Sequence, residues 1–127
     1  MEKQQNQFDE TFDVLVVGSG CGGLTAALTA DIASPSKVLV VEKSHLIGGT
    51  SATSGGVIWI PDNHLAKEKG ANDSISEAKE YLKATIPADE FNEPLIDAYL
   101  DQGPKMVKFM EENTDAKYTS LEHYPDY

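Results

Sequence analysis

The chain has 127 residues, the size of a single domain, and its 21 acidic against 10 basic residues give a net charge of −11 at pH 7. Such an acidic surface repels nucleic acid and anionic lipid, so neither is expected as a partner. The one cysteine, Cys21, excludes an internal disulfide bond, which suits a reducing compartment, and we expect it to be a small buried residue.

The first 11 residues form a polar tail that lacks the apolar core of a signal peptide or a membrane anchor. No window of about 18 apolar residues occurs anywhere in the chain, so the sequence predicts no integral membrane segment. We therefore expect a cytoplasmic protein.

Residues 13–23 have the pattern of a strand that ends in a glycine turn. Residues 13–17 are a short apolar run, typical of a parallel strand buried on both faces. Gly18, Gly20 and Gly23 then fit G-x-G-x-x-G, directly before a small-residue helix over residues 24–30. These glycines would allow the tight turn, the approach of a pyrophosphate and close packing of the helix, whose free amide groups would face the phosphates. The predicted cofactor-binding residues of this loop are Gly18, Ser19, Gly20, Gly22 and Gly23.

A second strand is predicted over residues 37–42, and it ends in an acid. Glu42 lies 19 residues beyond Gly23, where a carboxylate can accept hydrogen bonds from ribose hydroxyl groups. An acid at this position also argues against a 2′-phosphate, so NADP is the least expected occupant. Because strand, glycine turn, helix and acid agree, we favour a dinucleotide site over an unrelated glycine-rich turn.

A second glycine-rich segment, residues 48–56, favours FAD over a nicotinamide nucleotide. FAD is larger and is covered along much of its length. Residues 48–49 could open a short helix whose amide and hydroxyl groups face the pyrophosphate, and residues 55–56 could let the backbone pass a flat ring. A flexible linker is the alternative, but the apolar, strand-like residues 57–60 argue against it. The predicted cofactor-binding residues at the strand end and in this segment are Glu42, Lys43, Gly48, Gly49, Thr50, Ser51, Ser54, Gly55 and Gly56.

The rest of the chain has helical patterns. A short helix is expected over residues 63–69, and Ser74 with Glu77 forms a capping-box pattern before a second helix. A third helix would stop at residues 103–104, a Gly-Pro pair, and a last helix would restart there. The three histidines are scattered and have no cysteine partners, so no metal site is predicted.

Residues 16–20, 41–43 and 48–56 together resemble the start of the fumarate reductase/3-ketosteroid dehydrogenase group of flavoproteins. Residues 58–61 and 124–127 are most similar to its 3-ketosteroid Δ1-dehydrogenase branch. The resemblance implies an α/β fold, the N-terminal part of a Rossmann-like FAD-binding domain, incomplete because further strands and a catalytic domain follow in that family.

On this basis we divide the chain into a polar tail at residues 1–11, a dinucleotide-binding region with its glycine–serine segment at residues 12–62, and a mainly helical region at residues 63–127. All three would belong to one FAD-binding domain.

The activity implied by the resemblance is 1,2-desaturation of a 3-ketosteroid, with proton removal beside the carbonyl and hydride transfer to FAD. Tyr127 matches a tyrosine that lines the substrate cavity in this branch, so it is the candidate catalytic residue. The implied partners are a small-molecule substrate, a 3-ketosteroid, and an electron acceptor. We expect the 127-residue chain to be inactive by itself.

Two alternatives remain open. One is a fumarate reductase-like flavoprotein, whose arginine-rich substrate contacts are not visible in a chain that contains no arginine. The other is a non-catalytic FAD- or nucleotide-binding fragment.

Overall fold

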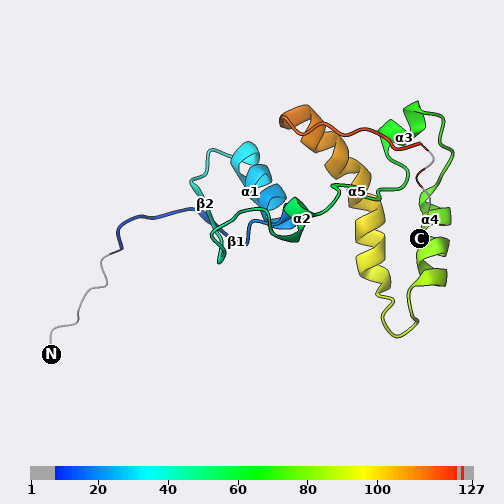
Figure 1. The fold of residues 1–127 in the computed structure, drawn as a ribbon, viewed down its shortest axis with the longest axis horizontal. Coiled ribbons are helices and arrows are strands. Elements are labelled where there is room, and N and C mark those ends of the chain that lie inside the picture. The colour runs from blue at the N-terminus through cyan, green and yellow to red at the C-terminus, as the bar shows by residue number, and fades with distance from the viewer. Residues whose placement is uncertain (1–7, 123, 125–127) are drawn as a thin grey trace. The chain divides into compact units, whose positions relative to one another are not determined.

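The computed structural model describes residues 8–122 and residue 124 (Figure 1). It forms two compact units, Met1–Val57 and Ile58–Tyr127, which we describe separately. The elements follow in the order β1 (Val14–Val17), α1 (Cys21–Ala33), β2 (Val38–Val41), α2 (Gly49–Thr53), α3 (His64–Glu68), α4 (Ile75–Thr85) and α5 (Glu93–Asn113).

The first unit is a β-α-β arrangement. Strands β1 and β2 pair in parallel, with Val14 opposite Val38 and Val17 opposite Val41. Helix α1 connects the two strands and packs against both of them (Figure 1). Beyond the ladder, the amide of Gly18 donates to the carbonyl of Val41 over 2.8 Å. The predicted α/β fold, with its order of strand, glycine turn, helix and strand, is confirmed.

One face of β1 is exposed, so the prediction of a strand buried on both faces is wrong for this chain. Side chains alternate along a strand, and Val16 faces α1, where its Cγ1 lies close to Gly23. Leu15 and Val17 point the other way and are 60% and 78% exposed. Parallel sheets usually have both faces covered, but the described residues of this unit cover only the α1 side of β1.

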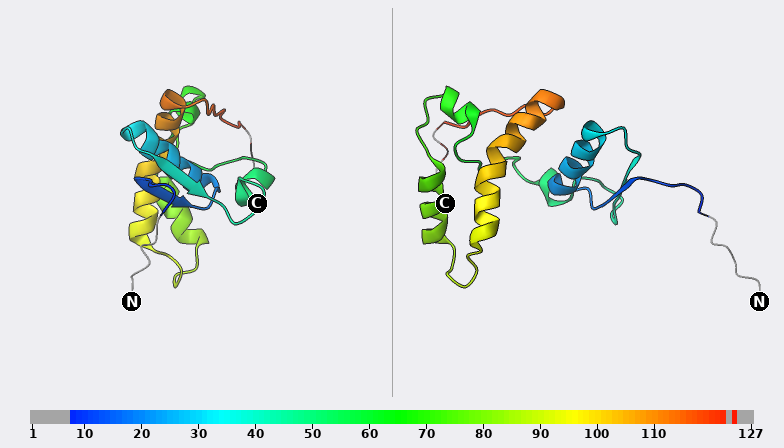
Figure 2. Two further views of the ribbon diagram at one scale, coloured as in Figure 1. Left: turned by 90° about the vertical axis from the view of Figure 1, so that its left-hand side faces the viewer. Right: turned by 180° about the vertical axis from the view of Figure 1, so that it is seen from behind.

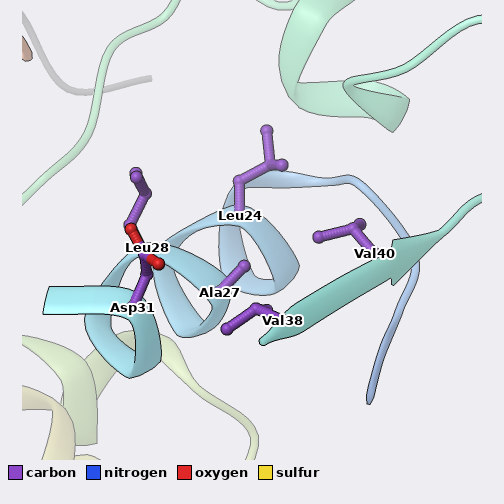
Figure 3. A pocket seen from close by; sticks show the side chains of 6 residues that line it. All are labelled: Leu24, Ala27, Leu28, Asp31, Val38 and Val40. Atoms are coloured by element: carbon purple, nitrogen blue, oxygen red, sulfur yellow. The ribbon is translucent and has the colours of Figure 1, made fainter. Parts of the chain in front are cut away.

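An aliphatic hollow of about 320 Å³ lies between α1 and β2. Leu24, Ala27 and Leu28 of the helix and Val38 and Val40 of the strand line it, with Ala27 next to Val38 (Figure 3). Asp31 supplies the one polar side chain of its lining. A small-molecule site needs several convergent polar groups, so this hollow has the character of a packing surface.

The second unit is helical, with α4 and α5 side by side and joined by a short loop (Figures 1 and 2). The N-cap of the predicted capping box is present, because the Ser74 hydroxyl accepts a bond from the amide of Glu77 over 3.2 Å. The Glu77 carboxylate accepts a bond over 3.0 Å from the Ser74 hydroxyl, where the full capping box has it accept from the Ser74 amide. Helix α3 ends before Gly70, close to the expected end. Among the described residues, no helix has both the length and the apolar character needed to cross a bilayer.

Helix α5 runs without a break through Gly103 and Pro104, so the predicted stop and restart there is wrong. A proline inside a helix costs about 3 kcal/mol, because it lacks an N–H and crowds the preceding turn. Leu100, Val107 and Met110 nevertheless lie buried on one stripe of α5. Each such side chain contributes about 1.5–3 kcal/mol when buried, so together they outweigh the cost of the proline.

Residues 57–60 form no strand, contrary to the strand-like expectation. Ile60 instead lies against α5 at Gly103, where a Cβ would come within 3.1 Å of the isoleucine Cγ2. The Trp59 ring lies 5.5 Å from the ring of Tyr81 and 6.4 Å from that of Tyr99. Packing within the second unit therefore places Trp59 and Ile60.

Candidate cofactor site

The glycine loop between β1 and α1 has the backbone that the motif predicts. Gly18 has a φ of +98°, a left-handed conformation that favours glycine. A Cβ on Gly23 would collide with the carbonyl oxygen of Gly18 and would lie 3.4 Å from the Val16 Cγ1. Gly23 thus allows α1 to start directly against the end of β1.

Gly20 is placed differently, because its α-carbon faces open space. A Cβ there would meet no heavy atom of the described residues within 4 Å. Gly20 is also the N-cap of α1, and no acidic side chain occupies the first turn of that helix. The turn keeps its partial positive charge, although the amide of its first residue, Cys21, already donates to the Ser51 hydroxyl. The backbone at Gly20 is therefore accessible to an anionic group.

Glu42 follows β2 and is held by the glycine loop. Its Oε2 accepts bonds from the Ser19 hydroxyl over 2.6 Å and from the Ser19 amide over 2.9 Å. Its Oε1 accepts a bond from the Ser44 amide over 3.0 Å. The Ser19 hydroxyl bond, followed by the two amide bonds, lowers the pKa of Glu42 to about 2 from an ordinary value of 4.5. The carboxylate is ionised at neutral pH and acts as an acceptor only.

The second glycine segment lies against the first. The amide of Gly48 donates to the Ser19 hydroxyl over 2.9 Å, and the amide of Cys21 donates to the Ser51 hydroxyl over 3.2 Å. Gly49 has a φ of +53°, and its α-carbon comes so close to Gly20 that a Cβ would lie 3.6 Å from the Gly20 Cα. The predicted short helix is α2, capped by Gly48.

A cleft of about 490 Å³ opens where these segments meet. It lies at the carboxyl ends of two parallel strands, the place where open α/β sheets bind nucleotides. Of the predicted residues, six line it. The lining residues are Val17, Gly18, Ser19, Gly20, Val41, Glu42, Lys43 and Gly49.

Two lining residues, Val17 and Val41, were not predicted. They are directly opposite each other in the sheet register, and they form an apolar wall beside the Glu42 carboxylate. Their positions are the signal that could have identified them, since each is the last residue of a strand and points away from the helix. The buried hydroxyl of Ser19, which links the two glycine segments, was not predicted either.

The other predicted residues lie outside the lining of this cleft. Gly22 is exposed in α1, and Gly48 and Ser51 hold the second segment against the loop. Thr50 and Ser54 bond within or beside α2, because the Thr50 carbonyl accepts from Thr53 and the Ser54 hydroxyl donates to the Ser51 carbonyl. Gly55 and Gly56 are exposed, and a Cβ on either would meet no described atom within 4 Å.

Two further expectations have different outcomes. Cys21 is exposed, so its predicted burial is wrong, because it is the first residue of α1 and its side chain has no described cover. Tyr127, the candidate catalytic residue, lies outside the described residues. Among the described residues, no group of three or more metal-ligating side chains comes together.

The cleft suits a dinucleotide. It offers an open backbone at a helix N-terminus for a pyrophosphate, an ionised carboxylate for ribose hydroxyl groups and an apolar wall for a base. Together with the parallel β-α-β arrangement, these features define a dinucleotide-binding unit of the Rossmann type.

Comparison with known proteins identifies the family. The FAD binding domain family matches residues 13–124, so the chain belongs to that family and FAD is its cofactor. The chain is 44% identical over 117 residues to 4-oxocyclohexanecarboxylate 2-dehydrogenase of Sinomonas cyclohexanicum, covering 92% of the chain and 20% of that relative. It is also 44% identical over 118 residues to 3-oxosteroid 1-dehydrogenase of Mycolicibacterium smegmatis, covering 93% of the chain and 20% of that relative.

A solved structure has the same fold and a similar sequence. The 3-ketosteroid delta1-dehydrogenase of Sterolibacterium denitrificans, in complex with 1,4-androstadiene-3,17-dione, matches with a TM-score of 0.69 and 45% identity. The match covers 80% of this chain and 17% of that one. The chain is thus an FAD-binding domain homologous to 3-ketosteroid dehydrogenases, and it spans about one fifth of the length of the curated relatives it matches.

Proposed function

We propose that the cleft at the carboxyl ends of β1 and β2 binds the ADP half of FAD. The observation that carries this placement is the open α-carbon of Gly20 at the N-terminus of α1, facing the same cleft as the ionised Glu42. Backbone amide groups of the glycine loop would hold the pyrophosphate. Glu42 would accept a bond from the ribose, and Val17 with Val41 would lie beside the adenine.

The second glycine segment would continue the site toward the isoalloxazine ring. Residues 48–51 lie directly on the glycine loop, so their amide and hydroxyl groups would extend the contacts along the pyrophosphate. The left-handed backbone of Gly56, with a φ of +73° and open space around it, would let the chain pass close to a flat ring.

The reaction that we propose is the desaturation of a 3-ketosteroid ring next to its carbonyl group. Relatives at 44% identity are named for dehydrogenation of cyclic ketones, one a steroid and one a cyclohexane carboxylate. Bound FAD supplies the hydride acceptor. From this chain, Tyr127 would contact the substrate, where a phenol can donate or accept a proton. An electron acceptor would be needed to reoxidise the cofactor.

The placement of FAD is tested with Gly20→Val. The added side chain would project into open space, so we expect the chain to fold while the pyrophosphate is blocked and FAD affinity falls by at least about 100-fold. Flavin fluorescence titration measures the affinity, and circular dichroism checks the fold. Ala33→Val is the control, since it places the same side chain at the far end of α1. Parental affinity in Gly20→Val would disprove the placement.

The substrate is tested with two chimeras, in which residues 13–127 replace the matching part of either named relative. Turnover of a 3-oxosteroid by the steroid chimera, with loss of activity in the cyclohexane chimera, is expected. The opposite result would favour 4-oxocyclohexanecarboxylate, the second candidate. In the active chimera, Tyr127→Phe should lower kcat by about 100-fold or more if the phenol transfers a proton. Unchanged turnover would exclude that role.

A further inference from the structure

Ser19 differs from the other residues of the cleft because its side chain is buried and its hydroxyl group both donates and accepts a hydrogen bond. The residue is 1% exposed. Its Oγ lies 2.6 Å from the Glu42 Oε2 and 2.9 Å from the Gly48 amide nitrogen. An amide can only donate, so the hydroxyl accepts from Gly48 and directs its own proton to Glu42. One side chain thus joins the end of β2 to the start of α2.

We propose that Ser19 is a positioning residue for the cofactor, whose hydroxyl holds the Glu42 carboxylate and the second glycine segment in their binding arrangement. This role rests on the proposed placement of FAD in the cleft. Ser19 would act through Glu42 and Gly48, not through a direct contact with the reacting atoms.

The bonds to Glu42 determine which oxygen is left for the ribose. Oε2 accepts two bonds from Ser19, one from the amide and one from the hydroxyl. Oε1 accepts a bond from the Ser44 amide and retains a second acceptor site. Ser19 thereby orients the carboxylate so that Oε1 presents its remaining acceptor site to a ribose hydroxyl.

The bond from the Gly48 amide to the Ser19 hydroxyl likewise holds the second glycine segment in position. Gly48 has a φ of +105° and caps α2. Without the Ser19 hydroxyl, the Gly48 amide loses its partner and α2 loses one of its links to the glycine loop. The remaining links are the bond from the Cys21 amide to Ser51 and the contact of Gly49 with Gly20. Removal of the Ser19 hydroxyl would therefore loosen both the Glu42 carboxylate and the second glycine segment.

The test is a double-mutant cycle on the full 127-residue chain, with FAD affinity measured by flavin fluorescence for Ser19→Ala, Glu42→Gln and the double variant. Loss of a hydrogen bond to a charged group should weaken FAD binding by about 10-fold in Ser19→Ala. In the Glu42→Gln background the same change should have less than about a 3-fold effect, because residues that act through one another are not additive. Ser36→Ala, which removes a half-buried hydroxyl that bonds Ser34 and does not line the cleft, should have no effect.

A second readout needs no cofactor. Titration of the Glu42 carboxyl carbon by NMR should show a pKa below the ordinary value of 4.5, and Ser19→Ala should raise it. A residue that only fills space would lower stability without moving this pKa. Ser19→Gly also lacks the hydroxyl, and it replaces Ser19→Ala if that variant does not fold.

The outcomes distinguish the placement of FAD in the cleft from the positioning role of Ser19. If Glu42→Gln leaves FAD affinity unchanged, the placement of the cofactor is wrong and the positioning role falls with it. If Glu42→Gln weakens binding but Ser19→Ala has an equal effect in both backgrounds, Ser19 does not act through Glu42, and that part of the positioning role is overturned while the placement of FAD stands. An unchanged pKa of Glu42 in Ser19→Ala would overturn it as well.

Discussion

Glu42 is the residue whose charge state the fold controls most clearly. Its carboxylate is bonded by the Ser19 hydroxyl and by two amide groups, and the pKa is lowered to about 2. A carboxyl group with a lowered pKa stabilises the folded state fully above its unfolded pKa, here 4.5. That stability is lost progressively as the pH falls from 4.5 toward 2.

We expect the free energies of unfolding of the parental chain and of Glu42→Gln to differ by an amount that depends on pH. The parental chain should have the larger free energy of unfolding at pH 6, and the gap should narrow as the pH is lowered below 4.5, because the unfolded carboxyl group then takes up a proton. Urea unfolding at several pH values measures it. A gap that stays constant between pH 6 and pH 3 would mean that the bonds to Glu42 do not lower its pKa.

Gly22 and Gly23 are neighbours in α1 with opposite environments. A Cβ on Gly23 would collide with the Gly18 carbonyl, whereas one on Gly22 would meet no described atom within 4 Å. We expect Gly23→Ala to destabilise the chain by about 1–3 kcal/mol through overpacking. Gly22→Ala should stabilise it by up to about 1 kcal/mol, because alanine favours the helix. Equal effects in urea unfolding would contradict the close approach of α1 to β1.

At residue scale, the sequence predicted glycine positions better than hydrogen-bond partners. The motif spacing identified Gly18 and Gly23, where a left-handed φ and a collision with the Gly18 carbonyl disfavour a side chain, and Gly20, whose α-carbon faces open space. It did not identify the role of Ser19, since a serine between two glycines carries no mark of burial. That role becomes visible only when residues 23 and 29 positions away reach the same hydroxyl.

At the scale of elements, sequence patterns predicted correctly those strands and helix ends that depend on residues close together in the chain. The valine runs gave β1 and β2, and the capping box gave the start of α4. They failed for α5, where a Gly-Pro pair has the local pattern of a helix end but buried contacts of Leu100, Val107 and Met110 keep the helix continuous. They failed also for residues 57–60, which form no strand; Ile60 packs against α5, and the Trp59 ring lies beside Tyr81 and Tyr99.

Replacement of Pro104 measures how much this proline costs the stability of α5. Pro104 has no N–H, so the Leu100 carbonyl cannot receive the usual helical bond from residue 104. We expect Pro104→Ala to stabilise the chain by about 2 kcal/mol, the cost of an internal proline less the entropy that alanine restores to the unfolded state. Pro94→Ala is the matched control, because a proline in the first turn loses no helical bond. No gain in urea unfolding for Pro104→Ala would mean that the proline is not strained.

At the scale of the molecule, the acidic chain must bind an anionic cofactor. The net charge is −11, and Lys43 is the one basic residue among the described residues that line the cleft. The pyrophosphate would therefore be held mainly by backbone amide groups, which are dipoles and not charges. The long-range field opposes FAD binding while the local contacts favour it.

Because the long-range field and the local contacts act in opposite directions, we expect an unusual dependence of FAD affinity on salt concentration. Between about 0.01 M and about 0.1 M salt the Debye length shortens from about 30 Å to about 10 Å, which screens the distant carboxylates more than the local amide contacts. FAD affinity should therefore rise with salt, whereas a site built from lysine and arginine would weaken. Fluorescence titrations at fixed pH measure the trend, and adenosine, which has no phosphate, should bind with little dependence on salt. If FAD affinity falls steeply as salt is added, cationic side chains and not the backbone at Gly20 would hold the pyrophosphate.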